Sequence, residues 1–105
     1  MATFLIVYKG GGEMPTTPEA QAASMVAWTG WFGGLGSAVI DAGNPFNGAA
    51  SIAANGAVTK GASSALTGYS VLSADSLAAA TTMAKGCPVL AAGGSIEIYE
   101  AFNVM

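Results

Sequence analysis

A nearly continuous apolar run close to the start of the chain constrains the fold more than any other feature. Thr3 to Tyr8 reads TFLIVY, so β-branched and aromatic residues follow one another without alternation, and Lys9 ends the run. Such a run is typical of a β-strand that is covered on both of its faces. We therefore expect packing partners above and below this strand.

The composition limits what can supply that cover. By the usual length of a domain, the 105 residues form a single one, residues 1–105. Apolar residues make up 52% of the chain, which is enough for a core and disfavours disorder. However, 22 residues are alanine and 15 are glycine, and these side chains bury little area. We therefore expect the domain to gain stability by pairing with a second copy.

Charge and cysteine content exclude several classes of partner. The net charge is −3 and no basic run is present, so neither nucleic acid nor an anionic membrane surface is an expected partner. The chain has no histidine and one cysteine, Cys87, so we expect no internal disulfide, no metal and no cofactor. A reducing, cytoplasmic setting fits this composition. Cys87 follows the end of a predicted helix, where no positive dipole lowers a thiol pKa, so we expect no reactive thiolate.

The uncharged stretch from Ala20 to Ile40 has the length of a membrane span. It contains several polar side chains and four glycines, and no basic residue flanks it, so we reject a span. The apolar run at 4–8 is too short for a signal peptide, and Lys9 follows it rather than precedes it. We expect no membrane contact.

A first helix is predicted to begin after Thr17, a capping residue, with Pro18 in its first turn. Spacings of three and four then place apolar residues on one face, and the glycines at 33, 34 and 36 end the helix. The residues expected on this face are Gln21, Met25, Trp28, Phe32 and Leu35, with Trp31 on its flank.

Short elements are predicted in the middle of the chain. A strand over Ser37–Asp41 is closed by the turn cluster Ala42–Pro45. Asn55-Gly56 is expected to form a tight two-residue turn between strands at 49–54 and 57–59, because both positions accept positive φ.

The second half of the chain repeats the strand, helix, strand pattern. Leu66–Leu72 is predicted as a strand, in which Gly68 indicates a bulge or a close approach of another backbone. A helix over Ser76–Lys85 follows, capped by Ser73 or Asp75, and Gly86 is expected to stop it in a left-handed conformation. Its expected buried stripe is Leu77, Ala80 and Ala84, with Met83 as a further candidate.

Ser95–Phe102 alternates between apolar and polar positions and is predicted as the last strand. Ile96 and Ile98 lie on one of its faces, and Glu97 and Tyr99 lie on the other.

This order of elements predicts an α+β fold. It corresponds to a ferredoxin-like split βαβ sheet, with two helices on one face of four antiparallel strands and a small hairpin insertion. Two helices on one face cannot cover the other side of the strand at 3–8. A second copy is the natural cover, because closed two-fold dimers are the commonest oligomers.

Several short sequence segments give a second, independent reason to expect this arrangement. They are FLIVY at 4–8, Gly36-Ser37, DAGNPF at 41–46, LTGYSVL at 66–72, ADSL at 74–77, KGCP at 85–88 and GGSIEIY at 93–99. Their order, over nearly the whole chain, resembles the YCII-related family, including its DGPF-type branch. The resemblance implies a small dimeric α+β barrel, and most members of that family have no assigned reaction.

The sequence departs from the family pattern at its proposed catalytic residues. YCII-type members carry a histidine and an aspartate proposed as a catalytic pair, and a few relatives catalyse small eliminations or isomerisations. This chain has no histidine, so Asp41 is the remaining acid near the matching strand end. The DGPF signature is also absent, because the corresponding stretch at 59–63 reads TKGAS. The resemblance therefore implies a fold and a dimer rather than a reaction.

Three charged residues each allow two interpretations. Asp41 is a carboxylate base if burial beside the tryptophans raises its pKa, or it caps the turn at 42–45 through its side-chain oxygens. Lys60 binds an anionic ligand or is a solvated hairpin residue. Glu97 shares a face with Tyr99, which looks either into a dimer, where the acid needs a partner, or to solvent.

Aromatic residues provide the candidate ligand-binding side chains. Trp28 and Trp31 lie three apart on the first predicted helix and could line a pocket for a flat apolar ligand. Tyr8, Tyr69 or Tyr99 would supply a phenol donor. In the alternative interpretation Trp28 belongs to the core, and Trp31 lies at a dimer surface or is partly exposed.

Three functional hypotheses follow. The first is a homodimer that binds a small apolar or aromatic ligand without chemistry of its own. The second is a lyase or isomerase that acts on a small cyclic acid, with Asp41 as base and a tyrosine as acid, in which Asp41→Asn abolishes turnover and leaves the dimer intact. The third is a structural or regulatory dimer whose surface around Trp31 binds another protein.

Overall fold

The computed structural model describes residues 1–10 and 16–102. An antiparallel four-stranded sheet with the order β2-β5-β1-β6 forms its centre, and β3 and β4 form a separate two-stranded hairpin. The α+β fold is therefore confirmed. The elements are β1 (Ala2–Lys9), α1 (Pro18–Leu35), the 3-10 helix η1 (Gly36–Ala38), β2 (Val39–Asp41), β3 (Ala50–Ile52), β4 (Val58–Lys60), β5 (Leu66–Ala74), α2 (Leu77–Ala84), α3 (Pro88–Ala91) and β6 (Ser95–Ala101).

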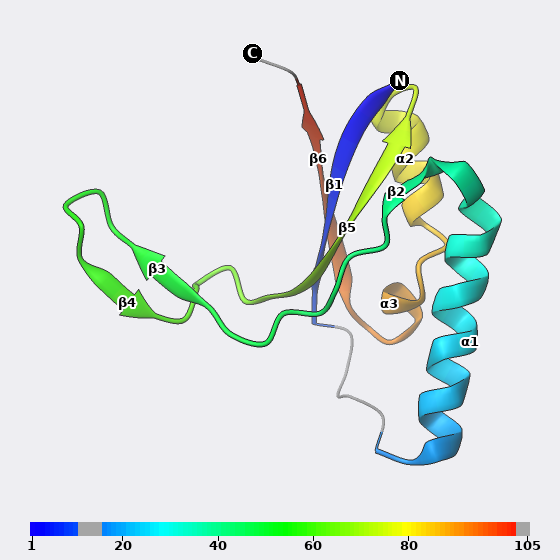
Figure 1. The fold of residues 1–105 in the computed structure, drawn as a ribbon, viewed down its shortest axis with the longest axis horizontal. Coiled ribbons are helices and arrows are strands. Elements are labelled where there is room, and N and C mark those ends of the chain that lie inside the picture. The colour runs from blue at the N-terminus through cyan, green and yellow to red at the C-terminus, as the bar shows by residue number, and fades with distance from the viewer. Residues whose placement is uncertain (11–15, 103–105) are drawn as a thin grey trace.

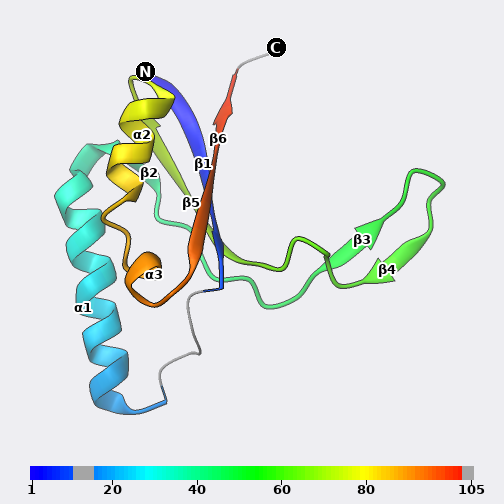
Figure 2. The same ribbon diagram turned by 180° about the vertical axis from the view of Figure 1, so that it is seen from behind.

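Within residues 1–10 and 16–102, the helices cover one face of the sheet only. Helices α1, α2 and α3 lie on one side of it, and the hairpin projects from the other side (Figure 1). The same division is visible from behind (Figure 2). Two helices were predicted on this face, and the short α3 is a third one. The core lies between helices and sheet and consists of Phe4, Ile6, Tyr8, Leu72, Ala74, Ala80, Cys87 and Val89.

We call the uncovered side of the sheet the open face. Leu5 pairs with Val71 and Tyr99 on its two neighbouring strands, and Val7 pairs with Tyr69 and Glu97 in the same way. Residues that lie directly opposite on paired strands share a face. The open face therefore carries Leu5, Val7, Tyr69, Val71, Glu97 and Tyr99, which is why the TFLIVY run of β1 shows no alternation.

Helix α1 begins as predicted, because the Thr17 hydroxyl accepts a hydrogen bond from Ala20 N at 3.1 Å. Its predicted apolar face is wrong in the first half, where Gln21 and Met25 are exposed. This half of the helix extends past the end of the sheet (Figure 1). In the second half Trp28, Leu35 and also Trp31 pack against the core.

The middle of the chain differs from the prediction in two places. The segment 37–41 begins as the 3-10 helix η1, so β2 is shorter than expected. The hairpin turn has three residues rather than two, since Ala53 N donates to Ala57 O and Gly56 N donates to Ala53 O. Only Gly56 takes positive φ there, while the Asn55 side chain accepts from Ala57 N at 3.0 Å. This is the three-residue type I turn with a left-handed glycine.

Helix α2 has a different cap and stop from those predicted. Ser76, and neither Ser73 nor Asp75, caps it by accepting a hydrogen bond from Ala79 N. Ala80 and Ala84 are buried as expected, whereas Leu77 is 48% exposed at the first turn. Gly86 does not take positive φ, because tight turn bonds lead the chain directly into α3 at Pro88.

A close backbone approach joins the chain after β2 to strand β5. Gly43 has φ +78°, and a Cβ there would lie 1.7 Å from the Tyr69 carbonyl oxygen. The backbone of Pro45 in turn lies against Gly68, where a Cβ would meet Pro45 Cα at 3.3 Å. The close approach predicted at Gly68 is therefore present, and it positions the segment that leads into the hairpin.

Candidate functional site

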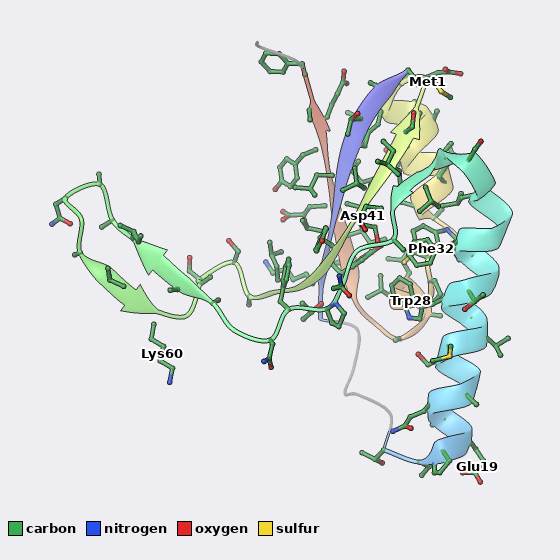
Figure 3. All side chains as sticks on the ribbon, viewed as in Figure 1. Met1, Glu19, Trp28, Phe32, Asp41 and Lys60 are labelled. Atoms are coloured by element: carbon green, nitrogen blue, oxygen red, sulfur yellow. The ribbon has the colours of Figure 1, made fainter. Side chains whose placement is uncertain are left out.

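The Asp41 carboxylate caps a turn. At the end of β2, its Oδ1 accepts a hydrogen bond from Gly43 N at 2.8 Å, and the residue is exposed. This is the geometry of the turn-capping interpretation. Asp41 pairs with Val71, which places it with the open face and not with the tryptophans (Figure 3).

The tryptophans belong to an aromatic cluster between α1 and the sheet. Trp28 and Phe32 point from the helix toward the sheet (Figure 3). The Trp28 ring meets Tyr8 edge-on at 5.3 Å and Trp31 at 5.9 Å between centroids. The indole Nε1 of Trp31 donates to Met83 O at 3.0 Å, so its polar group is satisfied within the fold. The cluster packs the helix against the sheet as part of the core. This agrees with the alternative interpretation, in which Trp28 is a core residue.

Tyr8 is held by a short hydrogen-bond chain inside the core. Ser70 Oγ donates to Ala42 O at 2.6 Å, because a carbonyl oxygen only accepts. The single Ser70 proton is thereby used, so the Tyr8 hydroxyl donates to Ser70 Oγ at 2.6 Å. Burial is the main cause that raises the pKa of the Tyr8 hydroxyl to about 12. This phenol is therefore a neutral structural donor.

Cys87 lies in the same region, at the N-cap position of α3, although its side chain makes no capping hydrogen bond. Burial raises the pKa of its thiol to about 11, although a hydrogen bond from the Val89 backbone acts in the opposite direction. The expectation of an unreactive thiol fits this environment, but its cause is burial, not the position after α2.

The two buried groups that titrate at high pH, the Cys87 thiol and the Tyr8 hydroxyl, make the free energy of unfolding depend on pH in the alkaline range. Both folded-state pKa values are raised, from 9.0 to about 11 for Cys87 and from 10.0 to about 12 for Tyr8. The stability that burial of their neutral forms contributes is therefore fully present below pH 9. It is lost as the pH rises toward the folded-state pKa values. We expect the free energy of unfolding to fall by up to about 1.4 kcal/mol per pH unit and group in this range.

Urea unfolding between pH 8 and 11 measures this profile. Cys87→Ala should remove the part of the decline that starts near the ordinary cysteine pKa of 9.0, and Tyr8→Phe should remove the part that starts near the ordinary tyrosine pKa of 10.0. Slopes in both variants equal to that of the wild type would contradict the assignment.

On the open face, Glu97 and Tyr99 lie side by side on β6 and are exposed. The Glu97 carboxylate is the main cause that raises the pKa of the Tyr99 hydroxyl. Leu5 is 38% exposed beside them, and Val7 is buried between its strand neighbours. The face thus offers apolar side chains with one acid at its edge.

A hollow lies at the base of the hairpin, beside the open face. The Phe46 ring stacks on Tyr69, with centroids 5.8 Å apart and an interplanar angle of 13°. Phe46 is still 45% exposed, so one side of its ring remains free. The hollow has a volume of about 450 Å³ and is lined by Phe46, Asn47, Gly48, Ala49, Ala62, Ser64 and Leu66.

The structure does not bring the predicted site residues together in one place. Trp28, Trp31 and Tyr8 form the inner cluster, Glu97 and Tyr99 lie on the open face, and Tyr69 backs the hollow. Lys60 projects from the hairpin into solvent (Figure 3).

Two negative findings apply to residues 1–10 and 16–102. Among these residues, no group of three or more His, Cys, Asp or Glu side chains could hold a metal ion. Of the helices formed by this part of the chain, none combines the length and the hydropathy that a membrane span requires.

Comparison with known proteins identifies no relative. No family model matches the chain, and neither a curated protein nor a solved structure gives a significant match. We therefore infer function from the residues of this chain and their geometry.

Sequence reasoning missed two residues of these sites. Phe46 entered the sequence analysis only as the last residue of the DAGNPF segment at 41–46, with no role of its own, although an aromatic residue directly after the predicted turn could have been noticed. Ser70 falls on the buried face of β5, which the alternation of the strand indicates once Leu72 is assigned to the core. A buried serine needs a partner, and Tyr8 supplies it.

Proposed function

We propose that this chain is a YCII-related, homodimeric α+β-barrel protein that binds a small apolar or aromatic ligand. The strand order β2-β5-β1-β6, with the helices on one face, supports the ferredoxin-like topology. The open face supports the dimer, because a second sheet would cover its exposed apolar side chains.

The observation that carries ligand binding is the half-exposed ring of Phe46 at the wall of the hollow. Its stacking on Tyr69 fixes the ring plane, so that a planar ligand can stack on the free side without further ordering. Leu66 and Ala49 add apolar side chains to the lining of the same hollow, and Asn47 and Ser64 add polar groups. This mixture is typical of a small-molecule site.

The proposal is tested by titrating the protein with indole, phenol and benzoate while heat of binding is recorded. We expect saturable binding of at least one probe and a loss of at least about tenfold in affinity in Phe46→Ala, because the stacking surface is removed. Phe102→Ala is the matched control, since Phe102 is exposed but lies outside the hollow. Absence of binding for all three probes, or equal losses in both variants, would contradict the proposal.

A further inference from the structure

The hairpin, with the segments that connect it to β2 and β5, forms an arm that we define as residues 46–66. Pairing of Ala50 with Lys60 and of Ile52 with Val58 places these four residues on one face of the arm. Ile52 and Val58 are 74% and 70% exposed. An isolated two-stranded hairpin is marginally stable in water, so an uncovered apolar arm face requires a partner surface.

The shape of the molecule leads to the same requirement. Its radius of gyration is 15.2 Å, whereas a compact domain of this length has about 13 Å. The arm, which projects from the side of the sheet that the helices leave uncovered, contributes to this excess together with the half of α1 that extends past the sheet (Figures 1 and 2). A body docked on the open face would therefore lie beside the arm.

The open face of β6 matches the arm face in charge and spacing. On β4, Val58 and Lys60 are two residues apart on one face, and on β6 Tyr99 and Glu97 are also two residues apart on one face. Two residues along a strand span about 6.7 Å in both cases. One apolar contact and one ion pair can therefore form together.

A two-fold axis that lies between two open faces and runs along the strands makes this pairing reciprocal. It sets the β2 edge of one sheet, from which the arm departs, over β6 at the far edge of the other sheet. In residues 1–10 and 16–102 the Glu97 carboxylate interacts with the neighbouring Tyr99 hydroxyl and no cation pairs with it, so its charge can still pair with Lys60 of a second copy.

We propose that the arm of each copy clasps a second copy, with Val58 against Tyr99 and Lys60 paired with Glu97 of the partner subunit. This inference rests on the proposed homodimer and specifies its geometry. The clasp also brings the partner to the base of the arm, where it closes the open side of the hollow that Phe46 lines.

Sedimentation equilibrium on the full chain tests the clasp by charge exchange. We expect Lys60→Glu and Glu97→Lys each to raise the dimer dissociation constant about tenfold, since each places like charges together twice in the symmetric dimer. The double variant Lys60→Glu/Glu97→Lys should return the constant to within about threefold of the wild type, because the pair is re-formed with opposite polarity.

Two matched controls carry the same charge changes elsewhere. Lys85→Glu alters the end of α2, and Glu100→Lys alters the side of β6 that faces the helices, since Glu100 pairs with the buried Phe4. Both should leave the constant unchanged. A wild-type dimer that the single variants do not weaken, or a double variant weaker than either single one, overturns the clasp and leaves the dimer intact. A wild-type monomer at micromolar concentration overturns both.

Discussion

Gly43→Ala is expected to lower the free energy of unfolding by more than about 3 kcal/mol, which is a large part of the stability of a domain of this size. The added methyl carbon would lie 1.7 Å from the carbonyl oxygen and 2.6 Å from the carbonyl carbon of Tyr69. Both are backbone atoms of the central strand β5, so neither can rotate away. The residue also has φ +78°, which disfavours any side chain.

Relief of this clash requires the segment after β2 to move away from β5. That movement breaks the hydrogen bonds from Tyr69 N to Asn44 O and from Phe46 N to Thr67 O. It also separates the Phe46 ring from Tyr69. We therefore expect Gly43→Ala to lose affinity for the aromatic probes as well as stability.

Substitutions at two other glycines distinguish the effect of the steric clash from the effect of the backbone conformation. Gly36 has φ +58° but no atom within 4 Å of its Cβ position, so Gly36→Ala measures the backbone conformation alone. Its ψ of −126° lies outside the left-handed helical region, in a conformation that L residues rarely adopt, so the substitution should cost about 2 kcal/mol. Gly48 has neither constraint, and Gly48→Ala should be nearly neutral. Equal effects of the three substitutions in urea unfolding would refute the close approach.

Local patterns in the sequence were sufficient for the elements whose structure is decided locally. The Thr17 cap with Pro18 placed the start of α1, and the alternation in SIEIYE separated Ile96 and Ile98 from Glu97 and Tyr99. The unbroken run in β1 indicated that its strand has two apolar faces, which the register with β5 and β6 reproduces.

The features that the sequence predicted wrongly depend on how distant segments of the chain are arranged. Met25 has the spacing of a buried residue, yet α1 extends past the sheet there, so periodicity alone could not reveal its exposure. Pro88 shortly after α2 is typical of a segment that cannot continue a helix, yet a proline also suits the first turn of a new helix, and α3 begins on it. The hollow depends on the approach of the segment at Gly43 to β5. Gly68 indicated that some backbone comes close to this strand, but no local pattern identified which segment does so.

The candidate site shows the same division between local and long-range information. The turn at Asp41 was visible in Ala42–Pro45, because its composition is that of a turn and the carboxylate had a backbone donor within two residues. The stacking of Phe46 on Tyr69 joins residues 23 positions apart and depends on the path of the backbone between them. The sequence was therefore sufficient to name aromatic residues as candidate ligand-binding side chains. It was not sufficient to show which of them lie together.

Leu5→Asp is expected to convert the proposed homodimer to monomers while the monomer stays folded. Leu5 is 38% exposed in a single chain, so a carboxylate there retains solvent in the monomer. In the dimer the same carboxylate would face the apolar side chains of a second open face, without a cation of its own. Each copy contributes one such group, and about 1.4 kcal/mol for each of the two raises the dissociation constant about a hundredfold.

Sedimentation equilibrium measures this shift, and circular dichroism verifies that the variant is folded. Leu77→Asp is the matched control, because Leu77 is a leucine of comparable exposure, 48%, in the first turn of α2 on the opposite side of the molecule. An aspartate in the first turn of a helix is favourable, so this control should remain dimeric and stable. If Leu5→Asp sediments as the wild-type dimer does, the second copy does not cover the open face, and the two apolar faces of β1 need another explanation.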